Sequence, residues 1–241
     1  MLQLPANIEQ HVADAVAHYW QTRQAQQQRQ MKGKRKDSGA RSAVTGGAQL
    51  DGFIRLFRSV IQAAGIGEEA IFTRKTLLEL PGFFRPTKEW DLVVVKDGRL
   101  LAAIEAKSQV GPSFGNNFNN RTEEAMGSAL DLWTAYREGA FGIERPFLGY
   151  CFMLEDCTAS SRPVSVREPH FPVRTEFHGT SYAKRYELFC RKLVLERHYS
   201  SAAFLTSCQD SGVGGAFATP AEDLSILGFV RSLCNHLATR A

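Results

Sequence analysis

Hydrophobic residues recur along this chain with two spacings, and each spacing predicts one kind of element. Apolar positions three or four residues apart predict helices over residues 7–31 and 49–66. Two apolar runs, 91–95 and 99–107, lie back to back and predict a pair of neighbouring strands. Further along, the pattern predicts a polar loop over 110–121, a helix over 122–142 capped by Thr122, a strand over 146–156, an irregular stretch over 157–178, a basic helix over 180–199, a strand over 201–207, and a C-terminal helix opened by Thr219-Pro220-Ala221-Glu222.

This order of helices and strands indicates the fold class. It predicts an α/β (α+β) core, with a central mixed β-sheet flanked by helices and with helical additions at the N- and C-terminal ends. The predicted helix over 122–142 has an apolar stripe that is expected to face the core. The stripe consists of Met126, Ala129, Leu130, Trp133 and Tyr136.

The pair of strands ends in charged residues that a buried hairpin does not need. Asp91 begins the first strand, while Glu105 and Lys107 share one face of the second, because side chains alternate along a strand. A regular two-residue turn would place Asp91 on the wrong face to meet Glu105. We therefore predict a bulged or longer connection, such as a three-residue loop over 97–99, or an equivalent kink near Asp91.

Two carboxylates at a strand end, with an ammonium group beside them, suit phosphodiester hydrolysis. Carboxylate oxygens are hard ligands for Mg²⁺, which keeps water and substrate phosphate as its other ligands. The metal lowers the pKa of a bound water and neutralises transition-state charge, and a lysine stabilises the same charge. The pattern by itself is equally consistent with a surface Glu-Lys pair beside an unrelated aspartate.

Composition changes this picture little, whereas the distribution of charge adds to it. A hydrophobic content of 44% and a charged content of 22% are typical of a soluble globular protein, and with no signal-peptide pattern a cytoplasmic location without membrane contact is expected. Five cysteines without a CxxC pair favour neither a disulfide framework nor a zinc site. The net charge is only +4, but cations gather in 29–41 and 182–197, which suits DNA binding and equally describes a solvated face.

The residues around the strand pair are similar to those of a known family. Asp91 with Glu105-Ala106-Lys107 resembles the PD-(D/E)xK nuclease motif, with the usual proline displaced to Pro86. The flanking stretches "LPGFFRPTKEWDLVVV" and "KSQVGPSFGNNFNNRTEEAMGSALDLWTAYREGAFG" closely resemble the XhoI family of type II restriction endonucleases. The resemblance also includes "TGGAQLDGF" at 45–53 and, more loosely, 170–193, and it covers most of the chain from about residue 40 to 200.

The resemblance implies a restriction-endonuclease-like fold and a Mg²⁺-dependent homodimer. Family members cut the palindrome CTCGAG in double-stranded DNA after the first C and leave four-base 5′ overhangs. Carried onto this chain, Asp91 and Glu105 are metal ligands, the backbone carbonyl of Ala106 is a further ligand, and Lys107 is the catalytic lysine. An acid from a preceding helix often joins such sites, and the candidates here are Asp51 and, as alternatives, Glu68 and Glu69.

The same resemblance sets expectations for organisation and partners. The chain is expected to form one endonuclease domain, 1–241, with an N-terminal helix and basic arm in 1–48, a catalytic core in 49–156, and DNA recognition and C-terminal helices in 157–241. A palindrome presents two equivalent half-sites, which a two-fold symmetric dimer meets with identical surfaces. A cognate DNA methyltransferase is expected as a partner in the same system, without a stable complex.

Two sets of polar residues are candidates for DNA contact. The first follows the catalytic strand and suits bases or phosphates, although such Asn-rich segments also stabilise loops by local hydrogen bonds: Asn116, Asn117, Asn119, Asn120 and Arg121. In the second set, Arg162, Arg167 and Arg174 would read guanines, contact phosphates or form plain surface charge, whereas Lys184 and Arg185 would contact phosphates or solvent. The basic cluster within 32–41 is a candidate arm that orders on DNA.

Three alternatives stay open. The first is a PD-(D/E)xK nuclease of another specificity, acting in repair or on branched DNA, but it offers no match for the long segment after the strand pair. The second is a non-catalytic DNA-binding protein of this fold, but Asp91, Glu105 and Lys107 are all present. The third is an enzyme unrelated to DNA, which the two basic segments disfavour.

Overall fold

A five-stranded mixed sheet lies at the centre of the computed structural model, which describes residues 4–32 and 48–240. The strand order is β1-β4-β5-β6-β7, with antiparallel pairing from β1 to β5 and parallel pairing from β5 to β7. The strands are β1 (Ile71–Phe72), β4 (Leu92–Lys96), β5 (Arg99–Gln109), β6 (Phe147–Glu155) and β7 (Ser201–Ser207). The predicted α/β class and central mixed sheet are therefore confirmed.

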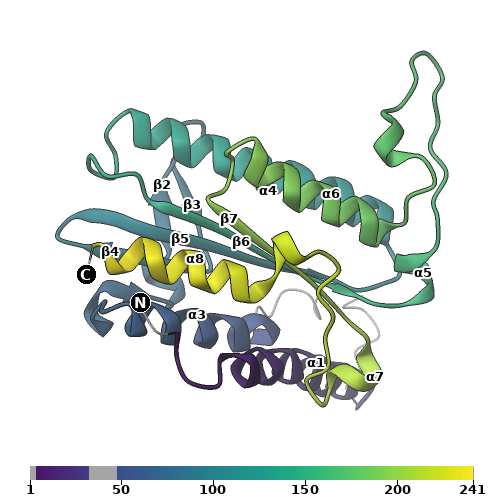
Figure 1. Ribbon diagram of the computed structural model, residues 1–241, viewed down its shortest axis with the longest axis horizontal. Helices are drawn as coiled ribbons and strands as arrows, with labels where there is room; N and C mark the ends of the chain where they lie inside the picture. The colour runs from purple at the N-terminus through teal and green to yellow at the C-terminus, as the bar shows by residue number, and fades with distance from the viewer. Residues whose placement is uncertain (1–3, 33–47, 241) are drawn as a thin grey trace.

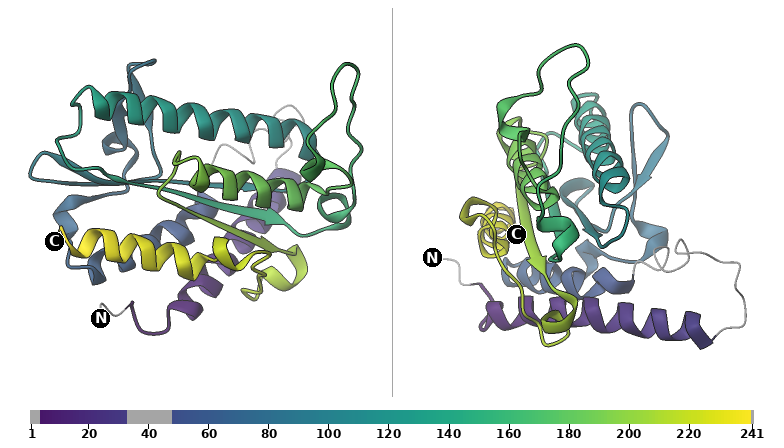
Figure 2. Two further views of the ribbon diagram at one scale, coloured as in Figure 1. Left: turned by 45° about the horizontal axis from the view of Figure 1, so that its top comes forward. Right: turned by 90° about the vertical axis from the view of Figure 1, so that its right-hand side faces the viewer.

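Helices cover both faces of the sheet and form three layers (Figure 1). On one face lie α4 (Phe114–Arg137) and α6 (Tyr182–Leu195), and on the other lie α1 (Ile8–Lys32), α3 (Asp51–Ala63) and α8 (Ile226–Ala238). Each face has its own buried apolar core. Figure 2 shows α1 on the outer side of α3, so the N-terminal helix is an addition to the sheet-and-helix core.

Short elements complete the described chain. They are η1 (Ala48–Leu50), η2 (Glu68–Ala70), η3 (Lys75–Leu77), β2 (Glu79–Pro81), β3 (Thr87–Glu89), α5 (Thr158–Ser161), η4 (Thr175–Phe177), α7 (Gln209–Gly212) and η5 (Glu222–Leu224). Among the described helices, none combines the length and apolar character that a membrane crossing requires. Of the predicted basic arm over 32–41, Lys32 is the last residue of α1 and residues 33–41 lie outside the described residues.

The structure corrects the prediction of a polar loop over 110–121. Helix α4 begins at Phe114, so the asparagine-rich segment is helical and Thr122 lies within the helix instead of capping it. Phe114 stacks on Tyr182 of α6, with ring centroids 5.8 Å apart, and Phe118 packs edge-on against Tyr186 at 5.0 Å. These contacts between distant parts of the chain supply the packing that extends the helix by two turns.

The same helix turns a different side to the core than its apolar spacing predicts. Ala129 and Trp133 are buried as predicted, but Met126 and Leu130 are 40% and 50% exposed. Asp131 lies on the buried side instead, because it binds a neighbouring hairpin.

The C-terminal helix also begins later than predicted. Thr219-Pro220-Ala221-Glu222 leads into the short helix η5, and α8 starts only at Ile226. Ser225 caps α8, because its hydroxyl accepts a hydrogen bond from the N–H of Gly228 at 3.2 Å. The predicted capping box is therefore wrong, since a serine closer to the apolar run takes the capping role.

The hairpin of β2 and β3 is fastened to α4 by Asp131. Its carboxylate accepts hydrogen bonds from the N–H groups of Phe83 and Phe84 at 2.7 and 2.8 Å, and from the Arg85 guanidinium at 2.8 Å. Burial alone would raise the pKa of Asp131, but these donors lower it below its usual value. The hairpin leads directly into Trp90 and Asp91, so this fastening fixes the approach to the first carboxylate.

Asp131→Ala is expected to lower the free energy of unfolding by about 2–3 kcal/mol, because two backbone donors lose a buried charged acceptor. Urea unfolding followed by circular dichroism measures the change. Glu123→Ala removes an exposed acid from the same helix and is the matched control. Equal stability of the two variants would contradict the role of Asp131.

Candidate active site

The connection between β4 and β5 is shorter than predicted. Lys96 pairs with Arg99, so the turn has two residues, Asp97 and Gly98. Both have positive φ, 53° and 71°, which is the geometry of the two-residue turn most compatible with strand twist. The predicted three-residue loop is therefore wrong, because an aspartate that tolerates the left-handed region precedes a glycine.

A bulge further along supplies the shift in register that was predicted. The pairing shifts next to Val94, where Leu101 of β5 is left without a partner in β4. Beyond the bulge Leu92 pairs with Ile104, and one further step along this register brings the two predicted carboxylates opposite each other. The β-bulge thus places Asp91 opposite Glu105, as the longer loop was expected to do.

Asp91, Glu105 and Lys107 meet at this point. Lys107 Nζ forms an ion pair with Glu105 and lies 3.4 Å from Asp91 Oδ2. Asp91 Oδ2 also accepts a hydrogen bond from the Ala106 N–H at 2.8 Å. Glu105 is almost fully buried, with 8% of its side chain exposed, whereas 36% of Asp91 reaches solvent. The site is therefore open on the side of Asp91.

The backbone carbonyl of Ala106 faces the same side as Asp91. In a strand the N–H and C=O of one residue point to the same edge, and the Ala106 N–H points to Asp91. β4 begins only at Leu92, which pairs with Ile104, so within the described residues no strand residue pairs with Ala106 on that side. Two carboxylates and this carbonyl form a set of hard oxygen donors of the kind that Mg²⁺ accepts.

The charges of the three side chains depend on one another. Burial alone would raise the pKa of Glu105, but the neighbouring Lys107 and Lys88 ammonium groups lower it below its usual value. Burial raises the pKa of Asp91 more than the Lys107 charge lowers it. Burial would lower the pKa of Lys107, yet the two carboxylates raise it. Glu105 is therefore ionised and Lys107 protonated at neutral pH.

A second lysine, which the sequence pattern did not predict, lies at the site. Lys88 of β3 forms an ion pair with Glu105 and donates a hydrogen bond to the Glu89 carbonyl oxygen at 2.9 Å. Its Nζ lies 4.0 Å from the centroid of the Trp90 ring. The hint in the sequence is a lysine three residues before the first motif acid, which the motif itself does not include.

The structure does not bring a third acid to the pair. Asp51 is exposed at the first position of α3. Glu68 and Glu69 precede β1, which runs antiparallel to β4, so they lie toward the end of β4 far from Asp91. Within residues 4–32 and 48–240, no group of three His, Cys, Asp or Glu side chains is arranged to hold a metal ion.

The first set of DNA-contact candidates lies on the opening turns of α4, next to the catalytic strand. Asn116 and Arg162 line one groove of about 330 Å³ together with Ser113 and Tyr182. Arg121 forms an ion pair with Glu124, and its charge is close enough to Lys107 to oppose protonation of that lysine. The remaining asparagines of the set are Asn117, which is partly buried, and Asn119 and Asn120, which are exposed.

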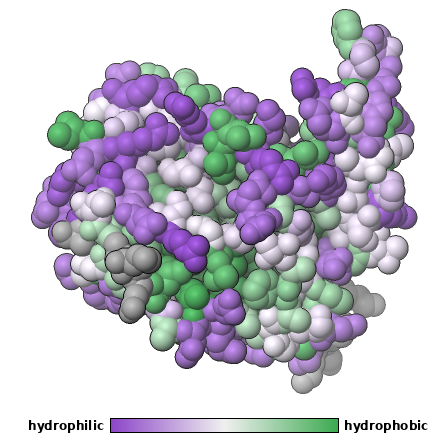
Figure 3. Space-filling model, viewed as in Figure 1, coloured by the Kyte–Doolittle hydropathy of each residue, from purple (hydrophilic) through white to green (hydrophobic). Residues whose placement is uncertain are grey.

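Three arginines of the second set lie on the segment between α5 and α6, which protrudes from the body and has a largely hydrophilic surface (Figures 1 and 3), and Lys184 and Arg185 lie in the first turn of α6. Arg185 holds the base of this segment, donating hydrogen bonds to the Val164 carbonyl oxygen at 3.1 Å and to Thr180 at 3.2 Å. The other four members are Arg162 and Arg167, which are exposed, Arg174, paired with Glu176, and Lys184, paired with Glu187.

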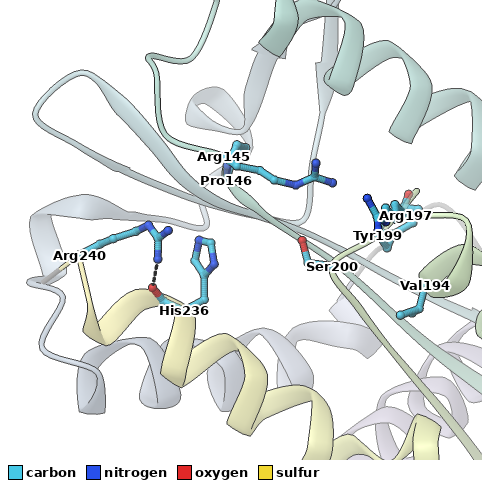
Figure 4. Close-up of a pocket in the computed structure, with 8 residues that line it drawn as sticks. All are labelled: Arg145, Pro146, Val194, Arg197, Tyr199, Ser200, His236 and Arg240. Atoms are coloured by element: carbon cyan, nitrogen blue, oxygen red, sulfur yellow. Dashed lines mark hydrogen bonds between the residues drawn. The ribbon is translucent and has the colours of Figure 1, made fainter.

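A cavity of about 380 Å³ lies away from these residues, beside the N-terminal ends of β6 and β7 (Figure 4). Arg145, Arg197, Arg240 and His236 line it. His236 of α8 packs against Phe147 with ring centroids 5.6 Å apart. Burial, and next the Arg240 charge, lower the pKa of His236 to about 4.

This partly buried histidine is expected to make stability depend on pH. Because its folded pKa of about 4 lies below the ordinary 6.5, the unfolded chain takes up the proton first as the pH falls. The free energy of unfolding is then expected to drop between pH 6.5 and 4, by at most about 1.4 kcal/mol for each pH unit. Urea unfolding across this range should show a shallower drop for His236→Gln. An identical pH dependence of the variant would contradict this prediction.

Known proteins confirm the family resemblance. Residues 28–219 match the family model described as Restriction endonuclease XhoI. The chain belongs to the XhoI family of restriction endonucleases. As a member of the XhoI family it is a type II restriction endonuclease, as predicted.

Named relatives cover most of the chain. Type II restriction enzyme BstVI of Geobacillus stearothermophilus is 53% identical over 86% of this chain and 94% of its own length. Type II restriction enzyme XhoI of Xanthomonas vasicola is 46% identical over 75% of this chain and 73% of its own, and AbrI of Azospirillum brasilense is 48% identical over 69% and 75%. No solved structure matches the chain.

Proposed function

We propose that this XhoI-family enzyme hydrolyses one phosphodiester bond in each strand of double-stranded DNA at CTCGAG. Cleavage falls after the first C and leaves 5′ overhangs, and Mg²⁺ is the cofactor. The observation that carries the proposal is the meeting of Asp91, Glu105 and Lys107 at the end of the bulged strand pair. The curated relatives bear the name of type II restriction enzymes, which supports DNA as the substrate.

The residues present fit a divalent metal. Asp91 and Glu105 provide carboxylate oxygens, and the Ala106 carbonyl faces the same side. When bound there, Mg²⁺ supplies an activated water and positive charge at the scissile phosphate. Asp51 stays a sequence-based candidate for a further ligand, although the described structure does not bring it to the pair.

Groups of the protein position the two carboxylates and the lysine ammonium group. The Ala106 N–H fixes the Asp91 carboxylate, and burial fixes Glu105. Lys107 holds a proton on Nζ and presents a positive charge to the negative charge that develops on the phosphate oxygens. In this proposal Lys107 acts as a positive charge and a hydrogen-bond donor toward the phosphate.

The DNA lies, in this proposal, along the side where α4 begins. Asn116 and Arg162 share a groove there, and asparagine and arginine suit adenine and guanine edges respectively. A palindromic target calls for a homodimer whose two subunits present the same surface. A methyltransferase that protects the host's own sites belongs to the same system and forms no stable complex with this chain.

Digestion of an unmethylated plasmid with a single CTCGAG tests the proposal. Linear product is expected with Mg²⁺ and not with EDTA, and sequencing of the ends should place the cut after the first C. A plasmid in which one base pair of the site is changed is the control and should stay intact. Cutting at other sequences would overturn the specificity, and an intact plasmid under all conditions would overturn the function.

A further inference from the structure

Lys88 enters the site from a different element than the three motif residues. It lies on β3, in the hairpin that Asp131 fastens to α4. Only 12% of its side chain is exposed, and its ammonium group has three neighbours: the Glu105 carboxylate, the Glu89 carbonyl oxygen and the face of the Trp90 ring. A lysine so enclosed is held in place and is not a surface charge.

The two lysines form ion pairs with different oxygens of the Glu105 carboxylate. Lys88 pairs with Oε2 and Lys107 with Oε1, so each Glu105 oxygen that would bind a metal already forms an ion pair with an ammonium group. Two ammonium groups balance the two carboxylates of the site. A divalent cation that binds Glu105 must therefore displace at least one lysine and work against the charge of both.

Of the two lysines, Lys88 loses less stabilisation when its ion pair with Glu105 is broken. Lys107 lies on the same strand and also interacts with Asp91, so it stays near both carboxylates. Among the described residues Lys88 forms no ion pair with a second carboxylate, but the Glu89 carbonyl oxygen and the Trp90 ring stabilise its ammonium group when Glu105 is withdrawn.

We propose that Lys88 is a positioning residue that neutralises Glu105 before a metal binds and that its ion pair sets how strongly the DNA-free enzyme binds a divalent cation. A cation competes with Lys88 for Glu105 Oε2. Metal binding is therefore weak until the Lys88 ion pair is broken. This inference rests on the proposed metal site at Asp91 and Glu105.

Calorimetric titration of the DNA-free protein with Mn²⁺ tests the proposal. Lys88→Met is expected to bind Mn²⁺ about tenfold more tightly than the wild type or better, because one positive charge next to the metal is removed. Lys88→Arg keeps the charge and should restore the weak wild-type affinity. Lys75→Met removes an exposed lysine elsewhere and should leave the affinity unchanged. Circular dichroism checks that each variant is folded.

Lys88→Met with the Mn²⁺ affinity of the wild type would overturn the proposal, as would tighter binding by Lys88→Arg. The Glu105→Gln variant separates this failure from failure of the metal site. If Glu105→Gln loses the Mn²⁺ binding of the wild type while Lys88→Met is unchanged, only the role of Lys88 is wrong. If wild type and Lys88→Met bind no Mn²⁺ and the wild type cuts no DNA, the proposed function is wrong as well.

Discussion

Glu105→Gln is expected to lower the rate constant of DNA cleavage by about 10³-fold or more, while specific DNA binding persists. Glu105 is buried and engages both lysines, and in the proposed function it is a metal ligand. Glutamine has nearly the same shape but no charge, so it binds Mg²⁺ poorly and removes the carboxylate that both ammonium groups share. The loss therefore falls on chemistry and not on recognition.

Single-turnover cleavage of a CTCGAG duplex at saturating Mg²⁺ measures this effect, and a binding assay with Ca²⁺ measures recognition. Glu68→Gln is the matched control, because Glu68 pairs with Arg58 on the surface near the far end of β4. Its cleavage rate should equal that of the wild type. A Glu105→Gln rate within tenfold of the wild-type rate would show that Glu105 does not hold the metal.

Lys107→Met is expected to lower the cleavage rate constant by about 10²–10³-fold, even at saturating metal. The protonated ammonium group is lost from the point where charge develops on the phosphate, and methionine offers no donor in its place. Unlike Glu105→Gln, this variant keeps both carboxylates, so Mn²⁺ binding should persist. Rate and metal affinity measured on one preparation separate the two roles.

Lys96→Met is the control for this variant, because Lys96 lies at the turn end of β4, on the same strand pair but away from the acids. It should cleave at the wild-type rate. Loss of Mn²⁺ binding by Lys107→Met would mean that the lysine organises the carboxylates and does not act on the phosphate. An unchanged cleavage rate would remove Lys107 from the reaction.

The sequence predicts the meeting of Asp91 and Glu105 because side-chain alternation allows only a shifted register. The sequence does not show whether a longer loop or a β-bulge shifts the register. Leu101 carries the bulge, yet it is one apolar residue among similar neighbours, and its lack of a partner depends on the whole strand pair. The two-residue turn is decided locally by Asp97-Gly98, and this signal was readable in the sequence.

Elements that depend on distant contacts are predicted less well. The opening turns of α4 carry asparagines with low helix propensity, and their stability comes from Phe114 and Phe118 packing on α6. Lys88 was missed for a similar reason. It reaches Glu105 because Asp131 fastens the hairpin from a helix more than forty residues further along the chain.

The position of a bound metal tests the central claim most directly. Crystals of the protein with a CTCGAG duplex, soaked in Mn²⁺, should give an anomalous difference peak between the carboxylates of Asp91 and Glu105, next to the scissile phosphate. The same crystals of Glu105→Gln should lack this peak. A peak elsewhere, with none between these two carboxylates in the wild type, would contradict the assignment of the site.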